Sequence, residues 1–177
     1  MTLLIDSNIV LDALLRRDEY NDDARKIMEL ICFGSCKAMV SASSVTDIYF
    51  LMTKSLRETT GKTSKELSPI VRSALGSYFC AVDIADTTKK DINNAFSSSI
   101  SDFEDSVVAS VAERYAVDYI VTRNTKDFKN SYIRAVNPQE AVELLKSISD
   151  KQPRRLLLPV EKTLSSEVST YFTESEA

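Results

Sequence analysis

The sequence predicts a three-layer α/β fold, in which a central, mostly parallel sheet of four to five strands is covered by helices on both faces. Two observations indicate this class. Short apolar runs that suit buried strands alternate along the chain with longer segments whose apolar residues recur at helical spacing. The chain has 177 residues, 44% of them hydrophobic and 27% charged, which is the size and composition of one ordinary domain with one core.

Five short apolar segments are predicted to be strands. They cover residues 2–5, 37–40, 80–84, 118–121 and 133–136. The first of them ends abruptly at Asp6, as a buried parallel strand does where it reaches a polar crevice. Because strands and helices alternate, right-handed crossovers are expected to connect the strands.

Seven segments are predicted to be helices. They cover residues 8–16, 21–33, 43–58, 64–79, 87–97, 101–115 and 138–148. Gly34 ends the second helix, and either Ser43 or Ser44 is expected to cap the third. Pro138 suits the first turn of the last helix. We expect one domain over residues 1–148, with residues 149–177 as a C-terminal extension that is either a disordered tail or a partner-binding arm.

The absence of histidine from the sequence excludes several kinds of catalytic site. A chain without imidazole has neither a Ser-His-Asp triad nor a histidine-ligated zinc ion. No apolar run approaches the length that spans a bilayer, so we expect no membrane segment. The odd number of cysteines and the early Asp6, which interrupts any signal-peptide apolar region, favour a cytoplasmic protein with free thiols.

Acidic side chains follow the predicted strands, at the edge of the sheet where α/β proteins bind their ligands. Asp6 ends the first strand, and Asp47 lies one turn into the helix after the second. Asp102 and Asp105 lie in the first turn of the helix 101–115, and Asp127 follows the strand 118–121. Converging carboxylates would raise one another's pKa unless a divalent cation lay among them. Oxygen ligands of this kind suit Mg²⁺ or Mn²⁺.

Each of these acids also has a structural explanation. Acidic side chains in the first turn of a helix complement its dipole and cap its free amides. The sequence Ser101-Asp102-Phe103-Glu104 fits a capping box, in which Glu104 reaches back to the serine amide. We therefore assign Glu104 to capping and expect Asp47 to have either role.

Several motifs together resemble the PIN domain, the metal-dependent ribonuclease fold of bacterial toxins of the VapC type. The matching segments are LLIDSNIVLDALLRR, SASSVTDIYFLM, SDFEDSVVASVAERYAVDYIVTRNTKDF and NPQEAVELL. They occur in the family's order over about residues 2 to 145.

The resemblance implies hydrolysis of phosphodiester bonds in single-stranded RNA with Mg²⁺ or Mn²⁺ as cofactor. It makes Asp6, Asp47 and Asp105 the catalytic acids, with Asp102 in support. The predicted metal ligands are Asp6, Asp105, Asp102 and Asp127. The predicted contacts to water or RNA are Ser7, Asn8, Thr122, Arg123 and Asn124. The resemblance also implies a homodimer and an antitoxin protein as partners.

The sequence departs from the family pattern at two positions. Asp47 stands where the family commonly has glutamate, and Asn124 stands where it usually has a fourth acid. These departures leave open a second hypothesis, in which the chain is a catalytically degenerate PIN-like module that binds RNA or another protein.

Overall fold

The computed structural model describes residues 1–15 and 18–149. The strands are β1 (Thr2–Ile5), β2 (Lys37–Ser41), β3 (Asp83–Ala85), β4 (Tyr119–Val121) and β5 (Ala135–Val136). The helices are α1 (Ser7–Leu15), α2 (Asp18–Cys32), α3 (Ala42–Thr60), α4 (Ser64–Tyr78), α5 (Lys89–Phe96), α6 (Phe103–Arg114) and α7 (Pro138–Ser149). The predicted C-terminal extension lies outside the described residues, except for Ser149.

The five strands form one parallel sheet in the order β3-β2-β1-β4-β5, with β1 at its centre. Leu3 and Ile5 contribute to one hydrophobic core, and Leu4 contributes to a second core on the opposite face of the sheet. All three side chains are at most 1% exposed. A central strand covered on both faces is expected to be apolar at every position, which explains the uninterrupted run that begins the chain.

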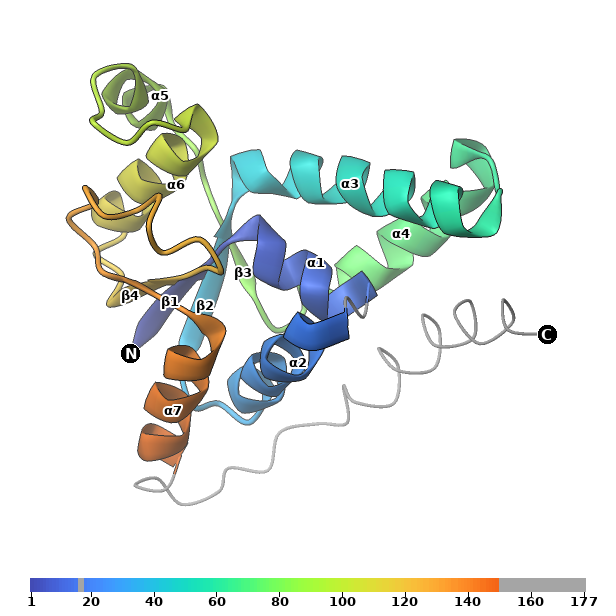
Figure 1. The fold of residues 1–177 in the computed structure, drawn as a ribbon, viewed down its shortest axis with the longest axis horizontal. Helices are drawn as coiled ribbons and strands as arrows, with labels where there is room; N and C mark the ends of the chain where they lie inside the picture. The colour runs from blue at the N-terminus through green and yellow to red at the C-terminus, as the bar shows by residue number, and fades with distance from the viewer. Residues whose placement is uncertain (16–17, 150–177) are drawn as a thin grey trace.

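Helices cover both faces of this sheet (Figure 1). The first core joins β1 and β2 to α1, α2, α3, α4 and α7, and the second joins the sheet to α6. Within these layers α2 packs against α7 and α5 packs against α6. The predicted three-layer α/β fold is therefore confirmed.

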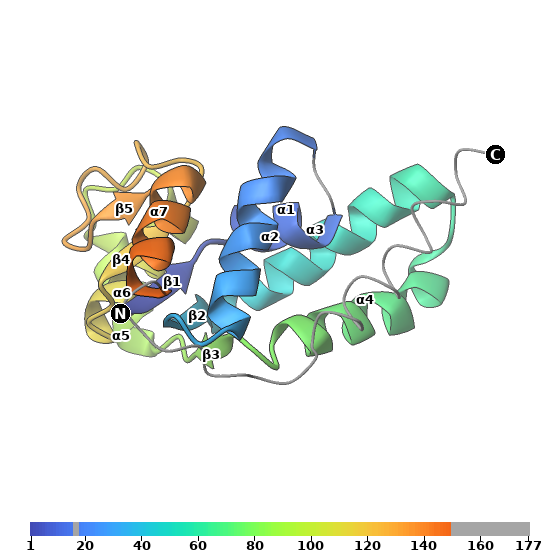
Figure 2. The ribbon, with the colours of Figure 1, turned by 90° about the horizontal axis from the view of Figure 1, so that it is seen from below.

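Helices α3 and α4 pack side by side and extend away from the sheet in both views (Figures 1 and 2). The phenolic oxygen of Tyr49 donates a hydrogen bond of 3.0 Å to Ser68 Oγ between them. Gly61 follows α3 with φ at +69°, in the left-handed region that favours glycine, and its amide donates to the carbonyl oxygen of Arg57. This glycine ends α3 and lets the chain turn into α4.

Two predicted helix caps are wrong. The N-cap of α3 is Ser41, and its hydroxyl lies within hydrogen-bonding distance of Ser43 Oγ and Thr87 Oγ1 instead of capping a helix amide. The N-cap of α6 is Asp102, which accepts hydrogen bonds from the amides of Glu104 and Asp105. No Ser101–Glu104 capping box forms, because the carboxylate of Asp102, one residue after Ser101, already accepts hydrogen bonds from the amides of Glu104 and Asp105.

The remaining differences concern element ends. Residues 80–82 form a turn before β3, so that strand is shorter than predicted and shifted along the chain. Helix α1 begins at Ser7, directly after Asp6. Among the described residues, no helix is long and apolar enough to cross a membrane. The cysteines Cys32, Cys36 and Cys80 are not joined in disulfides, and burial raises the pKa of Cys36 to about 11.

Candidate active site

The candidate site lies at the carboxyl edge of the sheet. Ile5 of β1 pairs in register with Val121 of β4, so Asp6 and Thr122 follow side by side where the two strands end. The amide of Asp6 donates to the carbonyl oxygen of Val121 over 3.0 Å, and the amide of Thr122 extends the ladder to Val136. The parallel register therefore brings two residues that are 116 positions apart into contact.

Asp6 is held in place by four hydrogen bonds and is only 6% exposed. Its Oδ1 accepts from the amide and the hydroxyl of Ser7, over 2.6 and 3.3 Å. Its Oδ2 accepts from Asn8 Nδ2 over 2.6 Å and from Thr122 Oγ1 over 2.7 Å. Burial raises the pKa of Asp6, although the bonds from Thr122 and Ser7 act in the opposite direction. The predicted contact residues Ser7, Asn8 and Thr122 thus orient the first carboxylate of the site.

Helix α6 brings a second set of acids toward Asp6. Asp102 is the N-cap, and Glu104 and Asp105 lie in the first turn. Val108, Val111 and Ala112 of the same helix are at most 4% exposed and pack in the core under the sheet. The buried face thereby fixes the direction in which the acidic first turn points.

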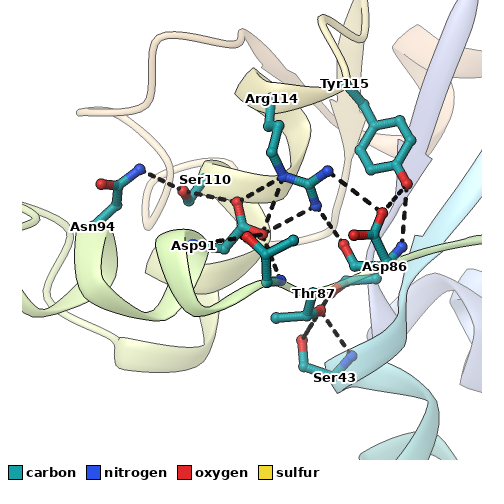
Figure 3. A network of polar contacts seen from close by, with 10 residues as sticks. Ser43, Asp86, Thr87, Asp91, Asn94, Ser110, Arg114 and Tyr115 are labelled. Atoms are coloured by element: carbon teal, nitrogen blue, oxygen red, sulfur yellow. Dashed lines mark hydrogen bonds and ion pairs between the residues drawn. The ribbon is translucent and has the colours of Figure 1, made fainter.

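A polar network fixes α6 against α5 and the loop before it (Figure 3). The guanidinium of Arg114 pairs with the fully buried Asp91 over 3.0 Å and with Asp86 over 3.4 Å. Asp91 also accepts hydrogen bonds from Thr88, which caps α5, and from Ser110. Although burial acts to raise the pKa of Asp91, the hydrogen bonds from Arg114 and Thr88 lower it to about 2. An ionised, buried carboxylate thus joins the two helices behind the site.

Asp105 is the acid whose protonation the structure perturbs most clearly. Burial raises the pKa of Asp105 to about 7. The negative charges of neighbouring acids contribute to this raised pKa, and they belong to Asp6, Asp102, Asp127 and Glu104. Within the described residues its carboxylate accepts no hydrogen bond, in contrast to that of Asp6. Asp105 is therefore a half-buried acid among negative charges, and no donor from the described part of the chain stabilises its ionised form.

Asp47 approaches this group from α3. The pKa of Glu104 is raised first by partial desolvation. Three nearby charges raise it further, those of Asp47, Asp102 and Asp6. The structure therefore brings together all five predicted acids, because each of the other four raises the pKa of Asp105 or of its neighbour Glu104. The five are Asp6, Asp47, Asp102, Asp105 and Asp127.

Glu104 is the acid that sequence reasoning assigned only to helix capping. Its side chain is exposed and does not reach back to a capping position, because Asp102 has taken that role. The available signal was the run Asp102-Phe103-Glu104-Asp105, which places a third carboxylate in the same turn. Glu104 consequently belongs with the candidate site residues.

The structure separates two of the predicted substrate contacts by role. Asn124 is exposed, and its backbone amide donates to Thr122 Oγ1 over 3.0 Å. This bond does not involve the Asn124 side chain. The Nε atom of Arg123 lies 3.3 Å from Oδ2 of the fully buried Asp12. Its positive charge also lowers the pKa of Asp6. Arg123 thus joins the site to α1, and Asp12 is a buried partner that the sequence pattern did not single out.

The donor set suits a hard divalent cation, since all the clustered ligands are carboxylates. As they stand, the described residues contain no group of three or more acidic, cysteine or histidine side chains close enough to hold one ion. Mg²⁺ usually keeps several waters and is held by one or two protein carboxylates.

Comparisons with known proteins agree with this architecture. One similar structure is a chain of the FitAB complex bound to an IR36 DNA fragment, with a TM-score of 0.55 and 16% identity over 77% of this chain and 94% of that chain. Another comes from the VapBC2 complex of Rickettsia felis bound to a DNA fragment from its promoter, with a TM-score of 0.53 and 18% identity over 77% of this chain and 98% of that chain. At such identities the likeness shows the shared fold.

No curated protein sequence matches the chain. A family model does match it, that of the PIN domain, over residues 2–126. This span includes β1 to β4, the acidic first turn of α6 and every one of the candidate acids except Asp127. The chain therefore belongs to the PIN domain family.

Proposed function

We propose that this PIN domain is an endoribonuclease that hydrolyses phosphodiester bonds in single-stranded RNA and depends on Mg²⁺ or Mn²⁺. The observation that carries the proposal is the acidic cluster around the first turn of α6, where burial and the neighbouring acidic charges together raise the pKa of Asp105 to about 7. Perturbed carboxylates that converge at the ligand-binding edge of an α/β sheet are typical of a catalytic site. Carboxylates alone would repel RNA, so a cation is also needed to bring the phosphate in.

The residues fit a divalent cation through their chemistry. Asp6 and Asp105 would be its main ligands, with Asp102 and Asp127 in support and with Glu104 and Asp47 beside them. When bound, such an ion lowers the pKa of a coordinated water and neutralises charge on a phosphate. Asp105, whose carboxylate accepts no hydrogen bond from the residues that the structure describes, is the group that gains most from a nearby positive charge.

The protein's own residues have distinct parts in this reaction. Ser7, Asn8 and Thr122 hold the Asp6 carboxylate in one orientation, so little ordering remains when substrate binds. In the metal-free protein the pKa of Asp105 is about 7, so near neutral pH this carboxylate can lose its proton and become available to hold a cation or orient an attacking water. Asn124 is exposed beside Thr122, where its side-chain amide would donate to a phosphate oxygen.

We further propose that the chain is the toxin of a toxin-antitoxin pair and acts in the cytoplasm as a homodimer. The similar structures are FitAB and VapBC2 complexes, which supports a small protein partner. Phe50 and Leu51 on α3 are 64% and 37% exposed, on the helix pair that extends from the sheet. Exposed apolar side chains of this size suit a protein contact.

Cleavage of a mixed pool of single-stranded RNA tests the proposed activity. The parent protein is expected to cut the pool in Mg²⁺ or Mn²⁺, and Asp6→Asn and Asp105→Asn are each expected to cut it at least about 100-fold more slowly. Asp83→Asn is the matched control, because Asp83 is an exposed aspartate at the opposite end of the sheet. Equal cleavage by all four proteins would reject the catalytic hypothesis.

A second candidate function is a degenerate PIN-like module that binds RNA or protein without cutting it. Asn124 in place of an acid and the absence, in the described part of the chain, of a ready metal-binding group favour it. This module would bind the same RNA pool in a gel-shift assay, with no cleavage by the parent protein in either metal.

A further inference from the structure

A polar hollow lies against α6, from Ser106 directly after the acidic residues to Glu113 near the end of the helix. It has a volume of about 350 Å³ and is bounded by α5, the loop between α5 and α6, α6 itself and the loop between β4 and β5. Of the described residues that line it, only Ile100 and Ala109 are non-polar. The lining groups used below are Asn94, Ser98, Ser106, Glu113, Asn130 and Tyr132.

The hollow offers hydrogen-bond acceptors that the protein itself leaves unused. Asn94 and Asn130 each donate their side-chain Nδ2 to a protein oxygen, over 3.0 Å to Ser110 Oγ and 3.1 Å to the carbonyl of Ser99. Among the described residues no donor reaches the Oδ1 of either amide or the carboxylate of Glu113. A ligand that fills this space would therefore need N–H or O–H donors along one edge.

Tyr132 supplies an aromatic surface at the same place. It is 88% exposed, although it is a large side chain in a short turn whose backbone is held by the bond from the Ser131 amide to the Phe128 carbonyl. Single-stranded RNA is recognised mainly through unstacked bases that stack on aromatic side chains and form hydrogen bonds along their edges. Polar acceptors beside an exposed tyrosine match this mode of recognition.

The hollow is also close to the candidate active site along one helix. Ser106 directly follows Asp105, and its hydroxyl donates to the carbonyls of Ile100 and Asp102. Ala109 lies four residues beyond Asp105, which is about 6 Å along the helix axis. A short stretch of single-stranded RNA is long enough to reach from the acids to the hollow.

We propose that this hollow binds one unpaired nucleobase of the RNA and thereby selects the sequence that is cut. The acceptors of Asn94, Asn130 and Glu113 select a base with N–H donors on its Watson–Crick edge, which guanine presents in largest number. Tyr132 stacks on the face of that base. The inference rests on the proposed ribonuclease function and adds to it the feature of the substrate that is read.

Sequencing the cut positions in a random single-stranded RNA pool tests this inference. The parent protein is expected to prefer guanine at one fixed distance from the cut. Tyr132→Ala and Glu113→Gln are each expected to reduce this preference about tenfold or more while cleavage itself continues. Phe33→Ala and Glu143→Gln are the matched controls. Both side chains are exposed and lie across the sheet from α6, Phe33 directly after α2 and Glu143 on α7. A flat base profile in the parent, or a profile that neither pocket variant changes, would overturn the inference and leave the proposed activity standing.

Binding of mononucleotides separates this inference from the proposed activity. Guanosine monophosphate is expected to shift the backbone amide signals of Ser98 and Asn130, with uridine monophosphate shifting them much less. Tyr132→Ala is expected to abolish the difference. If the parent protein cuts no RNA, these shifts still decide the pocket: equal, weak shifts from both nucleotides would reject it.

Discussion

At the scale of single residues, the structure gives two neighbouring aspartates different tasks. Asp6 is buried and accepts bonds from Ser7, Asn8 and Thr122, which fix its position. Asp105 faces the same cluster but receives no donor from the described residues, and its pKa is raised to about 7. One carboxylate is thus oriented by the protein, while the other responds to pH and to cations.

The raised pKa of Asp105 predicts how stability depends on pH. Between about pH 4 and pH 7 the folded protein holds a proton on Asp105 that the unfolded chain releases, so stability falls as pH rises through this window. Solvent screening reduces the effect, which we expect to be on the order of 1 kcal/mol. The contribution of Asp105 alone should make the melting temperature of the metal-free protein about 2–4 °C lower at pH 8 than at pH 4. Thermal unfolding at the two pH values measures this difference.

Asp105→Asn serves to isolate this contribution, because asparagine keeps the shape without the titration. The variant should be more stable than the parent at pH 8 in a chelator and should lose part of the parent's pH dependence. Mn²⁺ should stabilise the parent more at pH 8 than at pH 6, since the ligand must be deprotonated. A parent and variant with parallel pH curves would show that Asp105 titrates normally.

At the scale of elements, two glycines at or near helix ends are expected to respond oppositely to substitution. Gly61 has φ at +69° and ends α3, whereas Gly76 lies inside α4. An added Cβ meets no atom within 4 Å at either position, so only backbone conformation distinguishes them. Gly61→Ala should destabilise the fold by about 1 kcal/mol, and Gly76→Ala should stabilise it by about 0.5–1 kcal/mol. Chemical denaturation measures both, and equal signs would contradict this explanation.

The junction between α5 and α6 depends on the buried ion pair of Arg114 with Asp91 (Figure 3). Asp91→Asn leaves the guanidinium without its buried counter-charge and should destabilise the protein by about 2–3 kcal/mol. The side chain of Asp86, a second acidic partner of Arg114, is 63% exposed. Asp86→Asn should therefore destabilise the protein by less than about 1 kcal/mol. Urea unfolding of the two variants compares a buried with an exposed partner of one arginine. A larger loss for Asp86→Asn would contradict the assignment of the buried pair as the main link.

At the scale of the whole molecule, apolar patterning was enough to predict the layers of the fold. The uninterrupted apolar run of β1 predicted a buried parallel strand, which the structure places at the centre of the sheet, and Asp6 at its end predicted the location of the site. Helix caps were predicted less well, because several short polar side chains near α3 and α6 compete for the same amides and only the backbone path decides among them. Local sequence therefore determines where elements form better than it determines how they begin.

The candidate site was predictable in its acids and not in their environment. Asp6, Asp102 and Asp105 follow from strand ends and helix spacing, which are local properties. The role of Glu104 and the pairing of Arg123 with Asp12 depend on elements that meet only in the folded chain. Charge interactions between distant segments are tertiary properties, so no spacing rule along the sequence would have found them.

The net charge of −4 has a local meaning in this fold. Several of the acids gather around one helix turn, where the field disfavours RNA until positive charge is added. A cation at this turn would relieve the repulsion and at the same time bring in the phosphate. The whole molecule is therefore expected to be both more stable and more active with metal than without it.

The most direct test of the proposed function is the rate at which single-stranded RNA is cleaved as Mn²⁺ is added to protein and RNA that have first been treated with a chelator. The titration is done at about pH 7.5, which lies above the pKa of Asp105. The account predicts no cleavage by the metal-free parent, a rate that rises to a plateau with Mn²⁺, and a rate at least about 100-fold lower for Asp105→Asn at the same plateau. Cleavage that persists in chelator, or that is undiminished in Asp105→Asn, would contradict it.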